Sequence, residues 1–106
     1  MDKKVIMLIC AAGMSSTLLV ENMKKVAAKR GLDVTILAVS ALEALRKLDS
    51  RQIDVLLVGP QVRYMIPKFE PKAAEKSIPI ESINESDYRT MNGANVLDTA
   101  LSLIKN

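Results

Sequence analysis

Hydrophobic residues gather along the chain in short runs that alternate with helically spaced apolar positions. The runs are mostly aliphatic, and they predict strands at about residues 4–10, 34–39, 53–58 and 80–83. The apolar positions between and after the runs predict helices at about residues 15–30, from 41 onward, at 61–68 and at 95–105. The first strand is nearly all apolar, which is typical of a central parallel strand that is covered on both faces.

Local residues indicate where the predicted helices begin and end. Lys29 and Arg30 lie in the last turn of the first helix and Gly31 follows directly, so the dipole and stop signals agree. Ser40 and Glu43 form a capping-box pair at the start of the second helix. The apolar faces are predicted to be Leu18, Leu19, Met23, Val26 and Ala27 in the first helix, Leu42, Leu45 and Leu48 in the second, and Val96, Leu97, Ala100, Leu101 and Ile104 in the last.

The stretch between the third strand and the last helix has the least regular pattern. The short helix at about 61–68 is expected to stop at Pro67 and Pro71, since proline interrupts helical hydrogen bonding. From Lys68 to Asn92 the chain is rich in Lys, Glu, Pro and Ser. This composition predicts a surface loop that holds one short edge strand.

The alternation of strands and helices with short links predicts an α/β fold. It consists of an open four-stranded parallel sheet with helices on both faces. Right-handed crossovers make 2-1-3-4 the natural strand order, which gives a flavodoxin-like sheet of the kind found in low-molecular-weight phosphatases. A chain of 106 residues can bury one core, so we expect residues 1–106 to form a single domain.

The composition excludes several kinds of chemistry. The chain has one cysteine, which rules out an internal disulfide and a dithiol redox pair and fits a reducing compartment. It has no histidine, so it lacks an imidazole base, the commonest zinc ligand and any phosphohistidine of its own. We therefore expect no metal and no cofactor. A histidine that takes part in the chemistry must come from a partner.

The formal net charge of +3 is mild, and the basic residues are spread over loose clusters interleaved with glutamates. Nucleic-acid binding calls for a denser basic stripe and stacking aromatic residues, whereas this chain has one Phe, two Tyr and no Trp. We therefore expect no nucleic-acid partner. The basic clusters predict a solvated surface, and a docking face for an acidic protein is the alternative.

The first residues resemble a short signal peptide, because two lysines precede an apolar run. The run ends after roughly eight residues, close to the lower limit for such a segment, and it supplies the first strand of the predicted sheet. It is also far too short to span a bilayer. We expect a cytoplasmic protein that is peripheral to a membrane at most.

Cys10 stands where the first strand passes into a loop of small and hydroxylic residues. Backbone amides, hydroxyl groups and the dipole of the following helix could together bind a phosphate group. One of the three hydroxyls is expected to serve only as a helix cap. Amides and helix N-termini also favour a nucleophilic thiolate, although an inert buried cysteine is the alternative. The candidate phosphate-binding residues are Ala11, Ala12, Gly13, Met14, Ser15, Ser16 and Thr17.

The loop departs from the common phosphate-binding motifs. It lacks the second glycine and the lysine of a Walker loop, and one glycine cannot form a nicotinamide-type fingerprint. A cysteine-dependent phosphatase would carry C-x5-R, but the chain has Ser16 in place of the arginine. Hydrolysis of a phosphoryl group on Cys10 should then be slow, which favours a phosphoryl carrier. A phosphatase or arsenate-reductase-like enzyme and a non-catalytic regulatory domain of the same fold remain as alternatives.

A second motif follows the third strand. Gly59, Pro60 and Gln61 lie at its carboxyl end, as Cys10 does for the first strand. Ligands of such sheets bind at the carboxyl ends of the strands, beside the point where the strand order reverses. Because strands 1 and 3 are neighbours in the predicted order, we expect the two motifs to lie close together.

At these residues the chain resembles an enzyme IIB component of the bacterial sugar phosphotransferase system, from the lactose/N,N′-diacetylchitobiose/cellobiose family. The likeness extends over nearly the whole length and departs most between Phe69 and Met91. The matching segments are Cys10 to Val20, Val58 to Met65 and, more weakly, Tyr88 and Asn92-Gly93.

The resemblance implies a phosphotransferase that relays a phosphoryl group. The group would come from a phosphohistidine on a IIA protein, rest on the loop cysteine, and pass to a sugar that enters through the membrane protein IIC. By resemblance Cys10 is the phosphorylated residue, the loop from Ala11 to Ser16 surrounds the phosphate, and Gln61 and Tyr88 flank it. The pair Ser16-Thr17 inverts the hydroxyl order usual in the family.

Overall fold

Strands and helices alternate along the chain much as the hydrophobic pattern predicts. We describe them from a computed structural model, in which residues 3–10 and 14–104 are described. The elements in chain order are β1 (Lys4–Ile9), α1 (Met14–Lys29), β2 (Val34–Val39), α2 (Ala41–Ser50), β3 (Val55–Val58), the 3-10 helix η1 (Pro60–Met65), α3 (Ile66–Glu75), β4 (Ile80–Ser82), α4 (Glu85–Arg89) and α5 (Gly93–Leu103).

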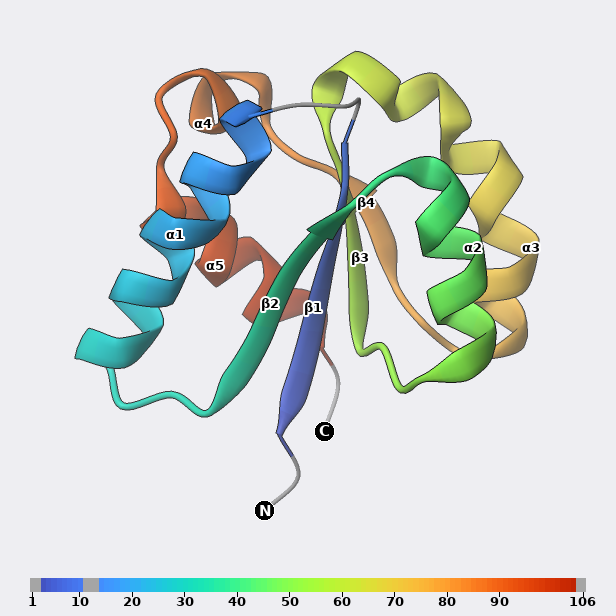
Figure 1. Ribbon diagram of the computed structural model, residues 1–106, viewed down its shortest axis with the longest axis horizontal. Coiled ribbons are helices and arrows are strands. Elements are labelled where there is room, and N and C mark those ends of the chain that lie inside the picture. Colours follow the sequence, from blue (N-terminus) through green and yellow to red (C-terminus); the bar gives the residue numbers. More distant parts are fainter. Residues whose placement is uncertain (1–2, 11–13, 105–106) are drawn as a thin grey trace.

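The four strands form one parallel sheet in the order β2-β1-β3-β4, which confirms the predicted fold class and topology. Strand β1 pairs with β2 from Lys4 opposite Val34 to Ile9 opposite Val39, and with β3 up to Ile9 opposite Val58. In Figure 1, α1 and α5 lie on one side of the sheet while α2 and α3 lie on the other. The sheet is therefore covered on both faces.

Successive residues of β1, together with Cys10 directly after it, belong alternately to two separate hydrophobic clusters. Ile6, Leu8 and Cys10 pack with residues of α1, α4 and α5. Val5, Met7 and Ile9 pack with residues of α2, η1 and α3 on the opposite face. All six residues are at most 6% exposed, so β1 is the buried central strand that its apolar sequence predicts.

The predicted helix ends are largely confirmed. Gly31 adopts a left-handed conformation with φ of 67°, and the N–H of Leu32 donates to the carbonyl oxygen of Ala27 at 2.9 Å. This is the glycine stop that the sequence indicates. At the start of α2, the side chain of Ser40 accepts a hydrogen bond from the backbone N–H of Glu43 at 3.3 Å.

Two residues that we assigned to buried helix faces are exposed. Leu18 in α1 is 53% exposed and Leu42 in α2 is 64% exposed. The core positions of these helices are instead supplied by Leu19, Met23 and Ala27 in α1, and by Ala44 and Leu48 in α2. At about 3.6 residues per turn both leucines lie on the side of the helix away from these buried residues, so the predicted apolar faces were too wide.

The predicted stop at Pro67 and Pro71 was wrong. Pro67 lies in the first turn of α3, where a backbone N–H has no partner within the helix, so proline is tolerated there. Pro71 lies inside the same helix, which continues to Glu75 because Phe69 and Ala73 bury its inner face against the sheet. Tertiary burial therefore outweighs the hydrogen bond that Pro71 cannot form.

The prediction of a surface loop from Lys68 to Asn92 was also wrong in part. This stretch holds most of α3, the predicted strand as β4, and the short helix α4. Asn84 caps α4, since its side chain accepts a hydrogen bond from the N–H of Asp87 at 3.0 Å. Five residues are too few for a hydrophobic period to show, which is why the pattern did not reveal α4.

Candidate functional site

Cys10 directly follows β1 and is held by the strands on both sides. Its backbone N–H donates to the carbonyl oxygen of Val39, the last residue of β2, at 3.1 Å. The preceding carbonyl, that of Ile9, accepts from the N–H of Gly59 after β3 at 2.8 Å. The residue is 6% exposed. The carboxyl ends of three strands therefore fix the backbone around this cysteine.

The motif after β3 lies beside Cys10, as the strand order predicts. A Cβ atom built on Gly59 would lie 3.8 Å from the Cα of Cys10 and 3.6 Å from the Oε1 atom of Gln61. The side chain of Gln61 thus turns back toward the turn that borders the cysteine, and the residue as a whole is exposed. The structure therefore brings Gln61 into the neighbourhood of Cys10.

The predicted phosphate loop can be followed only in part. Ala11, Ala12 and Gly13 lie outside the described residues. Helix α1 begins at Met14 and includes Ser15, Ser16 and Thr17, of which Thr17 is exposed. Since the helix starts four residues after Cys10, its positive N-terminal end lies at the same edge of the sheet as the cysteine. Figure 1 shows α1 starting where β1 ends.

Tyr88, the other predicted flanking residue, comes from α4. It is 7% exposed and belongs to the same hydrophobic cluster as Cys10. The structure thus places the α4 tyrosine in the packing layer that the cysteine faces.

A network of asparagine and aspartate side chains, which sequence reasoning missed, fixes α4 in place. Asn95 of α5 donates to the carboxylate of Asp87 at 3.0 Å, and Asn22 of α1 donates to the carbonyl oxygen of Met91 at 2.9 Å. The side chain of Asn92 caps α5 by accepting from the N–H of Asn95 at 3.0 Å. The two caps alone have a sequence signal, since Asn84 and Asn92 each lie at a helix start, three positions before the partner amide.

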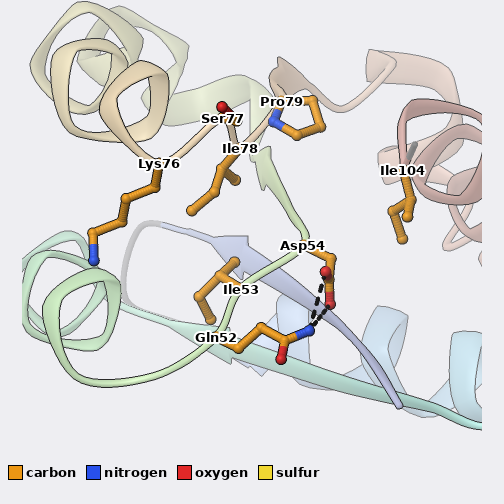
Figure 2. A pocket seen from close by; sticks show the side chains of 8 residues that line it. All are labelled: Gln52, Ile53, Asp54, Lys76, Ser77, Ile78, Pro79 and Ile104. Carbon is orange, nitrogen blue, oxygen red and sulfur yellow. Dashed lines mark hydrogen bonds between the residues drawn. The ribbon is translucent and has the colours of Figure 1, made fainter. Parts of the chain in front are cut away.

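A hollow lies at the end of the sheet opposite Cys10, and Figure 2 shows the residues that line it. It has a volume of about 700 Å³ and lies between the segments that lead into β3 and β4. Asp54 inside it is already engaged, because its carboxylate accepts from the N–H of Val5 at 2.7 Å and from Gln52 at 3.0 Å. The lining residues are Gln52, Ile53, Asp54, Lys76, Ser77, Ile78, Pro79 and Ile104.

The charges of the described residues are mostly at the surface. Asp49 in α2 and Lys72 in α3 form an ion pair of 2.6 Å, and this hydrogen bond lowers the pKa of the Asp49 carboxyl group. Within residues 3–10 and 14–104, no three His, Cys, Asp or Glu side chains are grouped so that they could hold a metal ion. Nor is any helix in that part of the chain both long and apolar enough to cross a membrane.

Comparison with known proteins identifies the family of the chain. Residues 5–99 match the family described as the lactose/cellobiose-specific IIB subunit of the phosphotransferase system (PTS). The galactose-specific EIIB component of Lactococcus lactis subsp. cremoris is 43% identical over 107 residues, covering 98% of this chain and 99% of that protein. The oligo-beta-mannoside-specific EIIB component of Bacillus subtilis is 36% identical, with coverage of 97% and 98%.

Two solved structures share the fold. The solution structure of a cellobiose-specific IIB component from Borrelia burgdorferi has a TM-score of 0.79 at 37% identity, covering 97% of this chain and 93% of that one. A lactose-specific IIB domain from Streptococcus pneumoniae has a TM-score of 0.82 at 17% identity, with coverage of 98% and 100%, and supports the fold alone. The chain therefore belongs to the lactose/cellobiose-specific IIB family of the PTS, whose members are phosphotransferases that act in sugar transport.

Proposed function

We propose that Cys10 is the residue that carries the phosphoryl group. The position of Cys10 is the observation that carries this proposal: it follows the central strand, and helix α1 starts four residues later at the same edge of the sheet. A cysteine beside a helix N-terminus favours the thiolate, and the helix dipole favours a bound phosphate. The amides of Ala11 to Thr17 would then surround the phosphate, with Gln61 and Tyr88 at its flanks.

The relay consists of two displacements at phosphorus. The Cys10 thiolate attacks a phosphohistidine of a IIA protein, so that a P–S bond forms, the P–N bond breaks, and its electron pair returns to the imidazole. A hydroxyl oxygen of the sugar then attacks the same phosphorus at the membrane protein IIC. The P–S bond breaks, the thiolate is regenerated, and the hydroxyl proton passes to a base or to water. The two partners and a cytoplasmic location are part of this proposal.

A carrier explains this sequence better than a hydrolase. Ser16 occupies the position where a C-x5-R phosphatase has its arginine, so no guanidinium from that position clamps the transferring group. A phosphocysteine that is hydrolysed slowly persists until the second partner binds. Similar IIB components are named for different sugars, namely galactose, cellobiose and oligo-beta-mannosides. We therefore assign the choice of the transported sugar to the whole transport system.

The test is transfer from a defined donor. The protein is incubated with phosphoenolpyruvate, the general phosphotransferase enzymes and a IIA protein of the lactose/cellobiose family, and its intact mass is measured. We expect the mass of one phosphoryl group, located on Cys10 by peptide mapping and absent from Cys10→Ala. Steady turnover of an aryl phosphate would instead favour a phosphatase. Sugar transport that survives in Cys10→Ser would favour a regulatory domain.

A further inference from the structure

Strand β2 lies at one edge of the sheet. In the described part of the chain it pairs with β1 alone, so its outer edge has no neighbouring strand. Five of its six residues are partly exposed and only Ile36 is buried, whereas every residue of β3 is buried. In Figure 1, α1 lies to one side of β2 and α2 to the other. Strand β2 therefore combines covered faces with an unpaired edge.

The other edge strand, β4, shows how this fold protects an edge. Strand β4 has three residues, the middle one is the exposed Glu81, and Pro79 directly precedes it. Short length, a charged side chain and a proline all hinder the addition of a further strand. Strand β2 is twice as long, and its sequence VTILAV contains no charge, proline or glycine. One edge of the sheet is thus protected, while the other is suited to pairing.

The hydrogen bonds to β1 show which backbone groups of β2 face outward. The carbonyl oxygen of Val39 accepts from the N–H of Cys10, so the backbone groups of Val39 face β1. Along a strand, the N–H and C=O groups of successive residues point to alternate edges. Those of Val34, Ile36 and Ala38 therefore point to the unpaired edge. They give it three donors and three acceptors.

We propose that β2 pairs with β2 of a second copy of the chain, in an antiparallel dimer with two-fold symmetry. When Ile36 lies opposite Ile36 of the other copy, Val34 lies opposite Ala38 on both sides of the axis. All these residues face outward, so each of the three pairs exchanges two hydrogen bonds. Opposite residues of a ladder also point to the same side of the sheet, so apolar side chains meet apolar side chains.

The charges near β2 favour a second copy as the occupant. No charge lies within β2, so the two-fold arrangement places no like charges opposite each other. Exposed Asp33 directly precedes β2 and contacts Lys3 at 3.6 Å. In the proposed register Asp33 lies opposite Val39 of the other copy, close to the start of its α2 at Ala41. A helix N-terminus favours a carboxylate, and the symmetry makes this contact twice.

The assembly closes at two copies. The joined sheet has β4 at both outer edges, because β2 and β4 are the edge strands of each copy. A six-residue ladder is a small interface, so the dimer should be weak and should form at high protein concentration. The inference goes beyond the proposed function and does not depend on it, since β2 contains no residue of the candidate site.

The experiment combines sedimentation equilibrium with amide hydrogen exchange, both from about 10 μM to about 1 mM protein. We expect the apparent mass to rise from that of one chain toward that of two. The amides of Val34, Ile36 and Ala38 should exchange about threefold more slowly when two thirds of the chains are dimeric. The amides of Thr35 and Leu37 face β1 and should exchange slowly at every concentration. This alternation is specific for pairing between strands.

Two variants alter the edge and leave the bonds to β1 in place. Thr35→Lys gives β2 the kind of charge that protects β4, and Thr35 belongs to neither hydrophobic cluster. Ala38→Pro removes one outward N–H. We expect both variants to stay monomeric over the whole concentration range. Glu81→Lys is the matched control, because it keeps a charge on β4 and should dimerise like the wild type. Thermal unfolding shows whether each variant is folded.

Several outcomes would overturn the proposal. One is a wild type that stays monomeric while its outward amides exchange equally fast at every concentration. Another is a dimer that persists in folded Thr35→Lys and Ala38→Pro, since it must use a different surface. Assembly beyond two copies would contradict the closed dimer. Protection of the outward amides that requires a second protein would assign the edge to that protein. Cys10→Ala should dimerise like the wild type, so a failure of phosphoryl transfer leaves this test unaffected.

Discussion

The side-chain amide of Asn22 donates a hydrogen bond of 2.9 Å to the carbonyl oxygen of Met91, which is 69 residues away in the chain. This bond joins the middle of α1 to the corner between α4 and α5. Met91 has a φ of 55°, a left-handed conformation that non-glycine residues rarely adopt. Gly93 lies beside it, against the backbone of α1. The corner that follows Tyr88 is therefore fixed on the helix that starts near Cys10.

Replacement of Gly93 by alanine should destabilise the protein. An added Cβ would lie 2.6 Å from the backbone carbon of Asn22 and 2.7 Å from the backbone nitrogen of Met23, so α5 would have to move away from α1. Overpacking of this kind costs about 1–3 kcal/mol, to be measured by urea unfolding. The control is Gly59→Ala, because its Cβ meets atoms only at 3.5 Å or more and its φ is −60°. Equal stability losses in the two variants would contradict this explanation.

The hydrogen bond from Asn22 can be tested with a nearly isosteric change. Asn22→Asp removes the donor and turns a carboxylate toward the Met91 carbonyl, so we expect a loss of about 1–3 kcal/mol at pH 7. When the carboxyl group is protonated it can donate again. The stability difference from the wild type should therefore shrink near pH 4 in urea titrations. A difference that is independent of pH would mean that packing, and not the hydrogen bond, matters at this position.

The Asp49–Lys72 pair should make a small contribution to stability that depends on pH. The hydrogen bond from Lys72 lowers the pKa of Asp49 below its ordinary value of 3.8, so the folded state favours the carboxylate. The contribution is present above that value and is lost as the pH falls through the lower folded-state value. Because the pair is at the surface, we expect Asp49→Asn and the wild type to differ little at pH 7, and less still in high salt or once the pH falls below the lowered pKa of Asp49.

A double-mutant cycle of Asp49→Asn with Lys72→Met isolates that pair. The coupling between the two sites should vanish at low pH. Coupling that persists after Asp49 has been protonated would contradict the ion-pair explanation.

Cys10 should react with alkylating reagents as a partly formed thiolate. Helix N-termini favour the thiolate, and only this form reacts. We expect the rate constant with iodoacetamide to rise less between pH 7 and pH 9 than that of glutathione, measured in parallel. A steeper rise, or no reaction in the folded protein, would indicate an inert buried cysteine. Inorganic phosphate at high concentration should slow the reaction if the loop binds it.

The hydrophobic pattern determined the strands and the fold class. Strands of aliphatic residues separated by helical periods permit few arrangements, of which right-handed crossovers favour the 2-1-3-4 order. This order also placed the turn at Gly59 beside Cys10, because adjacent parallel strands end at the same edge. These inferences succeeded because they depend on periodicity and chain connectivity, which are encoded locally.

Only the tertiary structure decided which of several plausible local outcomes occurred. Pro71 stays inside α3 because Phe69 and Ala73 are buried, and α4 is too short to have a period of its own. Leu18 and Leu42 were assigned to buried helix faces, yet both are exposed. Contacts such as Asn22 with Met91 join residues far apart in the chain. Burial depends on what packs against a residue in space, and spacing along the sequence does not contain that information.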